Sequence, residues 1–228
     1  MRLGRPRLHL REIGSTNARA RELAAAGAPH GTIVTADLQT AGRGRQGRAW
    51  TTPAGQALAV SLVVRDPDPL LSLRAGLAVA DLAGPDARVK WPNDVLLDGR
   101  KVAGVLVEGR PQEGWAIVGM GVNAALDLSA LPDELRERAG TLGLLPRDLP
   151  RALARLLEAL EARLTEPPTA TLAALRERDA LVGRPVRWEG GRGTAAGIRA
   201  DGALLVRLDD GTDLALAAGE VHLGENAY

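Results

Sequence analysis

The chain contains 228 residues, of which 45% are hydrophobic and 25% are charged, a composition typical of a globular protein. It has no cysteine, and its three histidines, His9, His30 and His222, lie far apart in the sequence, which excludes disulfide scaffolds, thiol chemistry and zinc ribbons. The formal net charge is +1 with acidic and basic residues interspersed, which argues against a nucleic-acid-binding protein held by a broad basic surface.

The N-terminal segment is basic, but no apolar segment follows it, so the sequence does not predict a signal peptide. No stretch approaches the roughly 18 apolar residues that a membrane helix requires. We therefore expect a cytoplasmic protein that contacts neither a membrane nor nucleic acid.

Short strands and helices alternate in the first half of the sequence. Polar and apolar residues alternate over 7–13, which predicts a half-buried strand. Ser15 precedes a short helix, and Gly27 followed by Pro29 ends it. Similar signals predict a strand over 32–37, a loop rich in glycine and arginine over 41–48, a strand over 57–64, a helix over 70–84, and strands over 89–91, 101–109 and 114–123.

The pattern then changes. Leucines recur at helical spacing between 149 and 164, with arginine and glutamate opposite, which predicts an amphipathic helix that packs on a core. Pro167 and Pro168 end this helix, and a second helix is predicted over 171–183. Closely spaced turn signals then predict a small all-β unit. We expect a boundary near residue 181, with one domain over 1–181 and a second over 182–228.

The rare residue types are unevenly distributed. Lys90 and Lys101 are the only lysines among 29 basic residues, and asparagine, serine and tryptophan each occur four times. This skew is typical of codon bias, so most arginines are expected to be solvated surface charge. Where a residue type that this bias disfavours is nevertheless present, it indicates a local chemical requirement. Such residues gather in five short segments, at 15–17, 42–50, 90–94, 101–108 and 119–123.

The densest segment is the loop over 42–50. Its glycines allow positive φ and close approach to a ligand, and Arg43, Arg45 and Arg48 supply guanidinium groups suited to carboxylate or phosphate oxygens. The glycines and like charges favour no single compact conformation, so we expect residues 43–48 to be disordered without ligand. A solvated arginine–glycine loop is the alternative. The segment matches neither a Walker loop nor a Rossmann fingerprint, because the residues and helix that those motifs require do not follow.

The two lysine segments differ in character. Pro92 restricts the preceding residue to an extended conformation, so 90–94 predicts a turn at the end of a strand, and turn chemistry alone is an alternative to a functional role. Lys101 begins an apolar strand, where a lysine ordinarily serves as a solubilising charge. Because arginine fills that role elsewhere, Lys101 indicates a site that requires a compact ammonium group.

The remaining two segments are less specific. Gly119 and Gly121 permit a ligand or another backbone to come close, and Asn123 has the donors and acceptors to bind a base edge or a phosphate. Helix capping is a sufficient role for at least one residue of 15–17.

Together the five segments form an ordered set of motifs. In one-letter code they read STN at 15–17, GRGRQGRAW at 42–50, KWPND at 90–94, KVAGVLVE at 101–108 and GMGVN at 119–123. This order resembles the biotin–protein ligases over most of residues 12–123, and the GRGRQGRAW and KWPND pair is its most specific part.

The resemblance implies an α+β fold, with a mixed β-sheet flanked by helices as in class II aminoacyl-tRNA synthetases and biotin ligases, and a small C-terminal SH3-like β-barrel. No helix-turn-helix segment precedes residue 7, so we expect the monofunctional type without the N-terminal DNA-binding domain. Gln46 stands where several relatives have arginine, which weakens a phosphate contact or the packing of the loop.

The implied activity is that of a biotin–protein ligase. ATP activates the biotin carboxylate to biotinyl-5′-AMP, with Mg²⁺ neutralising the triphosphate. The acyl group then passes to a lysine of the biotin carboxyl carrier protein, the carrier domain of acetyl-CoA carboxylase. Neither step needs an enzyme nucleophile, so positive charge and positioning are sufficient for a chain without cysteine.

The resemblance also implies residue roles. Lys101, Arg43 and Arg45 would act on the anionic groups, and Asp94 would position or deprotonate the acceptor lysine. No residue is expected to bind a metal. The expected biotin-binding residues are Ser15, Thr16, Asn17, Gln39, Gly42, Arg43, Gly44, Arg45, Lys101, Gly104 and Leu106. Those expected to bind ATP or the adenylate are Arg45, Arg48, Trp50, Asn93 and Asn123.

Other functions compete with this interpretation. A lipoate or octanoate ligase of related fold binds a linear apolar substrate, for which Ser15, Thr16 and Gln39 would have no polar ring to contact. An RNA-binding protein using the arginine–glycine loop is a second alternative, but an aromatic content of 2% supplies few stacking platforms. A homodimer formed through an exposed sheet edge is a further hypothesis.

Overall fold

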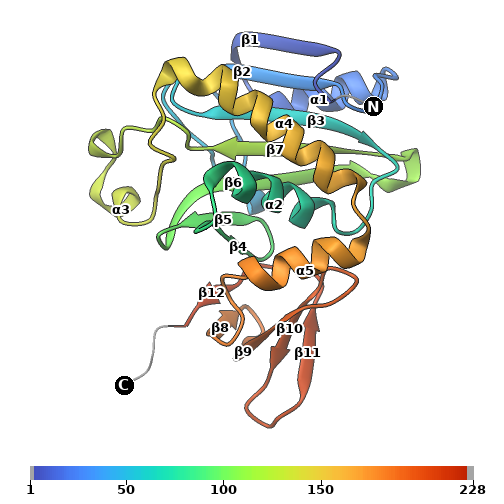
Figure 1. The fold of residues 1–228 in the computed structure, drawn as a ribbon, viewed down its shortest axis with the longest axis vertical. Helices are drawn as coiled ribbons and strands as arrows, with labels where there is room; N and C mark the ends of the chain where they lie inside the picture. Colours follow the sequence, from blue (N-terminus) through green and yellow to red (C-terminus); the bar gives the residue numbers. More distant parts are fainter. Residues whose placement is uncertain (1–2, 225–228) are drawn as a thin grey trace.

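The computed structural model describes residues 3–224 (Figure 1). A seven-stranded sheet in the order β1-β2-β3-β7-β6-β5-β4 carries the N-terminal part. Strands β1 and β2 are parallel, and the other neighbours are antiparallel. The strands are β1 (Arg7–Ile13), β2 (Ile33–Gln39), β3 (Leu58–Arg65), β4 (Arg88–Lys90), β5 (Asp94–Leu97), β6 (Arg100–Arg110) and β7 (Trp115–Val122).

Helices cover the two faces of this sheet unequally. Helices α2 and α4 pack together on one face, over a core that includes Ile33, Leu62 and Leu156. On the other face α1 packs against β2, β3 and β7 through Ala20 and Ala24. Figure 1 shows α4 crossing in front of the sheet and α1 behind it. The helices are α1 (Thr16–Ala25), α2 (Leu71–Ala83), α3 (Asp133–Arg136), α4 (Leu149–Thr165) and α5 (Pro168–Arg178), with 3₁₀ turns η1 (Arg45–Gly47), η2 (Pro111–Glu113), η3 (Leu128–Ala130) and η4 (Pro146–Asp148).

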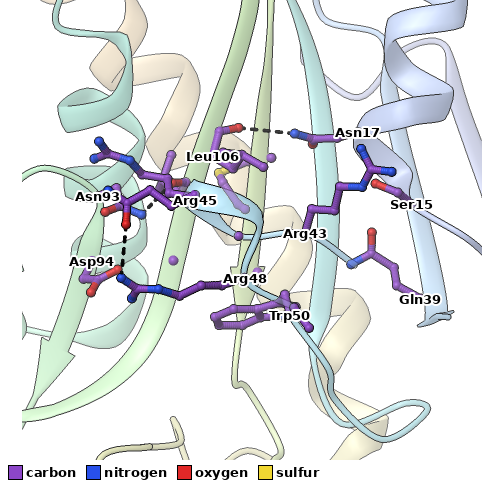
Figure 2. Close-up of a pocket in the computed structure, with 18 of the residues that line it drawn as sticks. Ser15, Asn17, Gln39, Arg43, Arg45, Arg48, Trp50, Asn93, Asp94 and Leu106 are labelled. Atoms are coloured by element: carbon purple, nitrogen blue, oxygen red, sulfur yellow. Dashed lines mark hydrogen bonds between the residues drawn. The ribbon is translucent and has the colours of Figure 1, made fainter. Parts of the chain in front are cut away.

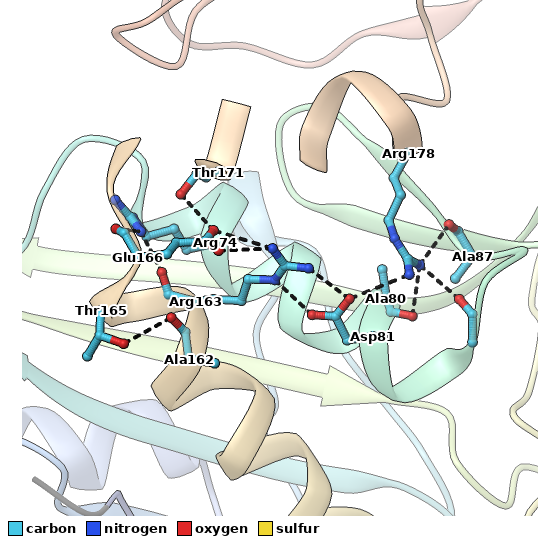
Figure 3. Close-up of polar contacts among 11 residues, drawn as sticks. Arg74, Ala80, Asp81, Ala87, Ala162, Arg163, Thr165, Glu166, Thr171 and Arg178 are labelled. Atoms are coloured by element: carbon cyan, nitrogen blue, oxygen red, sulfur yellow. Dashed lines mark hydrogen bonds and ion pairs between the residues drawn. The ribbon is translucent and has the colours of Figure 1, made fainter. Parts of the chain in front are cut away.

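On the sheet face that α2 and α4 cover, polar contacts join α2 to α4 and α5 (Figure 3). Arg74 is 2% exposed, donates to the carbonyl oxygens of Arg163 and Glu166, and lies 3.0 Å from an Asp68 carboxylate oxygen. Arg178 donates to carbonyls at the C-terminal end of α2, including that of Gly84 at 2.8 Å, and so satisfies acceptors that the helix leaves unpaired. These contacts fix the helical layer against the sheet.

The C-terminal part is a five-stranded antiparallel sheet in the order β11-β10-β9-β8-β12. The predicted small β unit is therefore confirmed, and the strand pairings of 185–223 describe an open sheet with β11 and β12 at its edges rather than a closed barrel. Its strands are β8 (Pro185–Trp188), β9 (Gly191–Ile198), β10 (Leu204–Arg207), β11 (Asp213–Leu216) and β12 (His222–Leu223).

Elements β5 and α5 differ from the sequence-based expectation, and the short helix α3 was not predicted. The turn predicted over 90–94 leads directly into β5, which was not predicted and which a two-residue turn at Asp98 and Gly99 joins to β6. Both turn residues have positive φ, the conformation typical of an Asp-Gly hairpin. Helix α5 begins at Pro168, because proline is well tolerated in the first turn of a helix, and it ends at Arg178, well before residue 183. No helix within residues 3–224 has both the length and the apolar composition of a membrane span.

Candidate active site

A pocket lies on the sheet face that α1 covers only in part, between the N-terminus of α1, strands β6 and β7, and the loop over 42–50. In Figure 2, Gln39 lies at one end, Asn93 and Asp94 at the other, and arginine side chains between them. The predicted site residues that line it are Ser15, Thr16, Asn17, Gln39, Arg43, Gly44, Arg45, Arg48, Trp50, Asn93, Asp94, Lys101, Gly104 and Leu106.

One end of the pocket is rich in uncharged polar side chains. The Gln39 Oε1 atom accepts the Thr16 backbone N–H at 2.8 Å and lies 2.9 Å from the Thr16 hydroxyl. The Asn17 amide nitrogen donates to a Glu108 carboxylate oxygen at 2.7 Å. Ser15 is the N-cap of α1, and its hydroxyl accepts the Ala18 N–H at 3.4 Å. Ser15 thus both caps α1 and lines the pocket.

The other end carries an ion pair beside an aromatic ring. The Lys101 Nζ atom lies 2.6 Å from Asp94 Oδ1 and 5.7 Å from the centroid of the Trp50 ring. Burial lowers the pKa of Lys90, which is paired with Asp94 across β4 and β5; that carboxylate raises it, and Lys101 and Arg48 lower it further. Lys90, Lys101 and Arg45 thus all interact with the Asp94 carboxylate, and this excess of positive charge suits this end of the pocket to anionic ligands.

The loop over 42–50, called the arginine loop from here on, forms the solvent side of the pocket. It contains the turn η1, in which Gln46 has a φ of 55°, the left-handed region that non-glycine residues rarely adopt. Arg45 donates to the carbonyl oxygen of Gly219 at 3.1 Å, and Arg48 forms an ion pair with Glu220. Burial also lowers the pKa of Arg45, an effect that Asp94 opposes. The loop thus contacts the segment between β11 and β12.

Two glycines of β7 make room for side chains of the pocket. A Cβ atom on Gly119 would lie 2.2 Å from Asn17 Oδ1, and one on Gly121 would lie 2.5 Å from the Trp50 ring. Real Cβ atoms do not approach other atoms so closely, so a side chain at either position would displace its neighbour. The sequence predicts close approach by a ligand or a backbone at these glycines, whereas the structure places side chains there.

Two predicted site residues, Gly42 and Asn123, do not line the pocket. Gly42 lies at the base of the loop, where its carbonyl accepts the Trp50 N–H at 2.9 Å and a Cβ would lie 2.3 Å from the Trp50 carbonyl oxygen. Asn123 is 5% exposed and donates to the carbonyls of Gly140 at 3.0 Å and Lys101 at 3.3 Å. Both residues hold backbone next to the pocket, and their expected ligand contacts stay predictions.

Sequence reasoning missed four residues at or next to the site: Ser61, Glu108, Gly219 and Glu220. Ser61 lies in a buried strand, and its rarity among the residue types was the only available signal. Glu108 ends the KVAGVLVE segment, whose glutamate was not assigned a role. Gly219 and Glu220 come from the C-terminal sheet, and nothing in the sequence links them to the arginine loop.

Family models match two regions of the chain. A model described as the biotin/lipoate A/B protein ligase family matches residues 10–124, and one described as the biotin protein ligase C terminal domain matches residues 182–224. The two regions correspond to the seven-stranded sheet and to the five-stranded sheet.

Individual proteins are also similar over much of the chain. A biotin–[acetyl-CoA-carboxylase] ligase of Mycobacterium tuberculosis is 38% identical, with 93% of this chain and 87% of that protein covered. A bifunctional ligase/repressor of Bacillus spizizenii is 41% identical over 57% of this chain, but the chain spans only 44% of that relative's length. A biotin protein ligase of Aquifex aeolicus, solved in complex with biotin and ATP, superposes with a TM-score of 0.83 at 27% identity, covering 96% of this chain and 100% of that one.

Proposed function

The chain belongs to the biotin/lipoate A/B protein ligase family, and from this membership and the geometry of the pocket we propose that it is an ATP-dependent, AMP-forming biotin–protein ligase. One observation carries the proposal: a single pocket combines a neutral end, at Thr16 and Gln39, with a cationic end at Lys101. Biotin has the matching polarity, because a neutral cyclic urea and a carboxylate stand at opposite ends of the molecule.

In the first step a carboxylate oxygen of biotin attacks the α-phosphorus of ATP. The bond from that phosphorus to the bridging oxygen breaks, pyrophosphate leaves, and biotinyl-5′-AMP forms. The reacting groups are both anionic, so the barrier falls when fixed positive charge lies beside them. We assign this role to Lys101 and to Arg43 and Arg45 of the loop, with Arg48, Trp50, Asn93 and Asn123 on the nucleotide side.

The magnesium requirement is proposed to be met by the nucleotide. Within residues 3–224 there is no group of three or more His, Cys, Asp or Glu side chains that could hold a metal ion. Phosphate oxygens are ligands that Mg²⁺ prefers, and it commonly binds proteins through only one or two carboxylates. We therefore expect Mg²⁺ to enter with ATP and to offset the charge of the triphosphate.

In the second step the acceptor lysine of a biotin carboxyl carrier protein attacks the acyl carbon of the adenylate, and AMP leaves. A lysine has an ordinary pKa of about 10.4, so it must lose a proton first. Asp94 is the carboxylate among the predicted pocket residues, and we propose that it positions or deprotonates this amine.

The pocket favours biotin over lipoate. Thr16 and Gln39 form a hydrogen-bonded polar end, and Ser61 extends it behind the pocket wall. The ring of lipoate has no N–H or carbonyl group to pair with it. A polar site discriminates strongly against an analogue that leaves its groups unpaired.

The test is incubation of the protein with ATP, Mg²⁺, biotin and a purified carrier domain, followed by intact mass measurement. We expect a biotin adduct on the carrier, and none when lipoate or octanoate replaces biotin. Absence of the biotin adduct, with a positive-control ligase active on the same carrier, would remove the proposal.

Several broader features belong to the same proposal. We propose a catalytic domain over 1–181 and a C-terminal domain over 182–228, action in the cytoplasm on the carrier domain of acetyl-CoA carboxylase, and self-association through β1, which lies at the edge of the sheet. Light scattering with and without biotin tests self-association.

A further inference from the structure

We infer that Ser61, a buried residue of β3 outside the sequence motifs, sets the hydrogen-bond polarity of the neutral end of the pocket, so that this end selects a ring carrying its own N–H donor. The inference rests on the proposed function, because the ring is taken to be the cyclic urea of biotin. Ser61 would act through Thr16, as a positioning residue.

Four oxygen atoms follow one another at this end of the pocket. Gln39 Oε1 lies 2.9 Å from Thr16 Oγ1, which lies 2.8 Å from Ser61 Oγ, which lies 2.6 Å from Asn17 Oδ1. Ser61 is 0% exposed and Asn17 is 6% exposed, so bulk water does not reach the inner half of this row. Every contact in the row must be satisfied by the protein or by a ligand.

The two ends of the row are fixed as acceptors. Gln39 Oε1 accepts the Thr16 backbone N–H at 2.8 Å, which turns the oxygen of that amide toward Thr16. The Asn17 amide nitrogen donates to Glu108 Oε2 at 2.7 Å and to the Leu106 carbonyl at 3.4 Å, which turns its oxygen toward Ser61. Hydrogen atoms for the row therefore come only from the two hydroxyl groups.

Two hydroxyl hydrogens serve three oxygen–oxygen contacts, so one contact lacks a hydrogen. When Ser61 donates to Asn17 and accepts from Thr16, the contact between Thr16 and Gln39 is the one without a hydrogen, and the Thr16 oxygen presents only lone pairs to a ligand. A ligand N–H beside Thr16 would then be satisfied, whereas a ligand ether or carbonyl oxygen would face lone pairs. Without the Ser61 oxygen, the Thr16 hydrogen loses its inner acceptor and can turn toward the ligand, so Ser61 maintains this preference.

The test measures equilibrium binding of biotin and of its two cyclic carbamate analogues, in each of which one ring N–H is replaced by oxygen. For the unmodified protein we expect biotin to bind at least about a hundredfold more tightly than one of the analogues. For Ser61→Ala we expect biotin to bind about tenfold more weakly and the same analogue to change little, so that the preference shrinks about tenfold. Ser129→Ala, which removes an exposed hydroxyl, is the matched control and should leave the preference unchanged.

The preference is a ratio, so a smaller folded fraction of Ser61→Ala would lower both affinities equally and would not move it. If the variant is insoluble, Ser61→Cys, with its weaker donor, carries the same measurement and should shrink the preference by a smaller factor. An unchanged preference in a folded variant would overturn the role of Ser61. Failure of the unmodified protein to bind biotin would instead overturn the proposed function.

Discussion

The Lys101 ammonium group and the Asp94 carboxylate form a close ion pair in the wall of the pocket, with 2.6 Å between Nζ and Oδ1. The pair joins β6 to β5, and the centroid of the Trp50 ring lies 5.7 Å from the ammonium nitrogen. An anionic substrate group that binds Lys101 must share it with Asp94. The pair thus holds the ammonium group at a defined position before substrate binds. Lys101 therefore supplies a fixed positive charge, unlike a mobile surface lysine.

Lys101→Arg tests whether the compact ammonium is required. Arginine keeps the charge but is planar and longer, so it cannot occupy the same position between Asp94 and Trp50. We expect adenylate formation, measured as biotin-dependent release of pyrophosphate, to fall at least about a hundredfold. Arg100→Lys, at the exposed neighbouring position, should remain active. Activity within about threefold of normal in Lys101→Arg would reject the point-charge role.

Asp94→Asn separates the two steps of the reaction. If the carboxylate positions or deprotonates the acceptor lysine, transfer from preformed biotinyl-5′-AMP should slow about a hundredfold, and the loss should lessen as the pH rises toward the pKa of free lysine. The measurement is single-turnover transfer to the carrier domain between pH 7 and 10. Unchanged transfer together with impaired adenylate formation would leave Asp94 as the partner of Lys101 only.

Gly121→Ala tests the packing of the indole ring against β7. The new Cβ would lie 2.5 Å from the ring of Trp50, so the ring must move away from the sheet and from Lys101. We expect weaker ATP binding in the presence of biotin, by about tenfold, with little change in biotin affinity, as measured by titration calorimetry. Gly76→Ala is the control, because its Cβ would make an ordinary 3.4 Å contact with Val89 on the opposite face. Equal ATP affinity in both variants would contradict the assignment of Trp50.

Much of the site could be predicted because its residues are unusual for this chain and lie in short segments. The loop over 42–50 and Lys101 stand out by glycine content and residue rarity, and both line the pocket. Ser61 could not be predicted, because its strand reads as continuous apolar core and its partners lie 44 and 45 residues away. Its role depends on the register of β3 beside the N-terminus of α1.

The elements of the fold, like the residues of the site, divide into those that local sequence signals predict and those that they do not. Helix α4 and the buried strands follow from hydrophobic periodicity, whereas β5 is short and begins at Asp94, the last residue of a turn signal. The link from Arg48 to Glu220 spans 172 residues and depends on how the two sheets are placed, which no local pattern contains. Local signals thus identify elements and motifs, and the contacts that complete the site come from tertiary structure.

Glu220→Gln tests whether the C-terminal sheet holds the arginine loop. The change removes the charge that pairs with Arg48, and a partly exposed ion pair contributes up to about 1 kcal/mol. We expect trypsin to cut within 43–48 roughly two- to fivefold faster in the variant without ligand, and slowly in both proteins with biotin and ATP. Asp213→Asn, which breaks the pair with Arg207 elsewhere in that sheet, is the control.

The same digestion tests the expectation that the loop is disordered without ligand. Rapid cutting of the unmodified protein that biotin suppresses would support it. Equal resistance with and without biotin would contradict it, and equal rates for Glu220→Gln and the unmodified protein would show that the ion pair does not restrain the loop.

Arg74→Met tests the contribution of the polar layer in Figure 3 to stability. Methionine fills a similar length of apolar space but leaves the carbonyls of Arg163 and Glu166 without their donor and Asp68 without its ion pair. The two carbonyls would lose a buried charged donor, whereas the Asp68 side chain is 44% exposed and stays hydrated, so we expect the free energy of unfolding to fall by about 3 kcal/mol. Urea unfolding followed by circular dichroism measures the change.

The control is Arg155→Met, at an exposed position of α4, which should change the free energy of unfolding by less than about 0.5 kcal/mol. Because Arg74 lies on the face opposite the pocket, the affinity of the folded variant for biotin should be unchanged; a loss of affinity without a loss of stability would show that the helical layer positions the site instead of stabilising the fold.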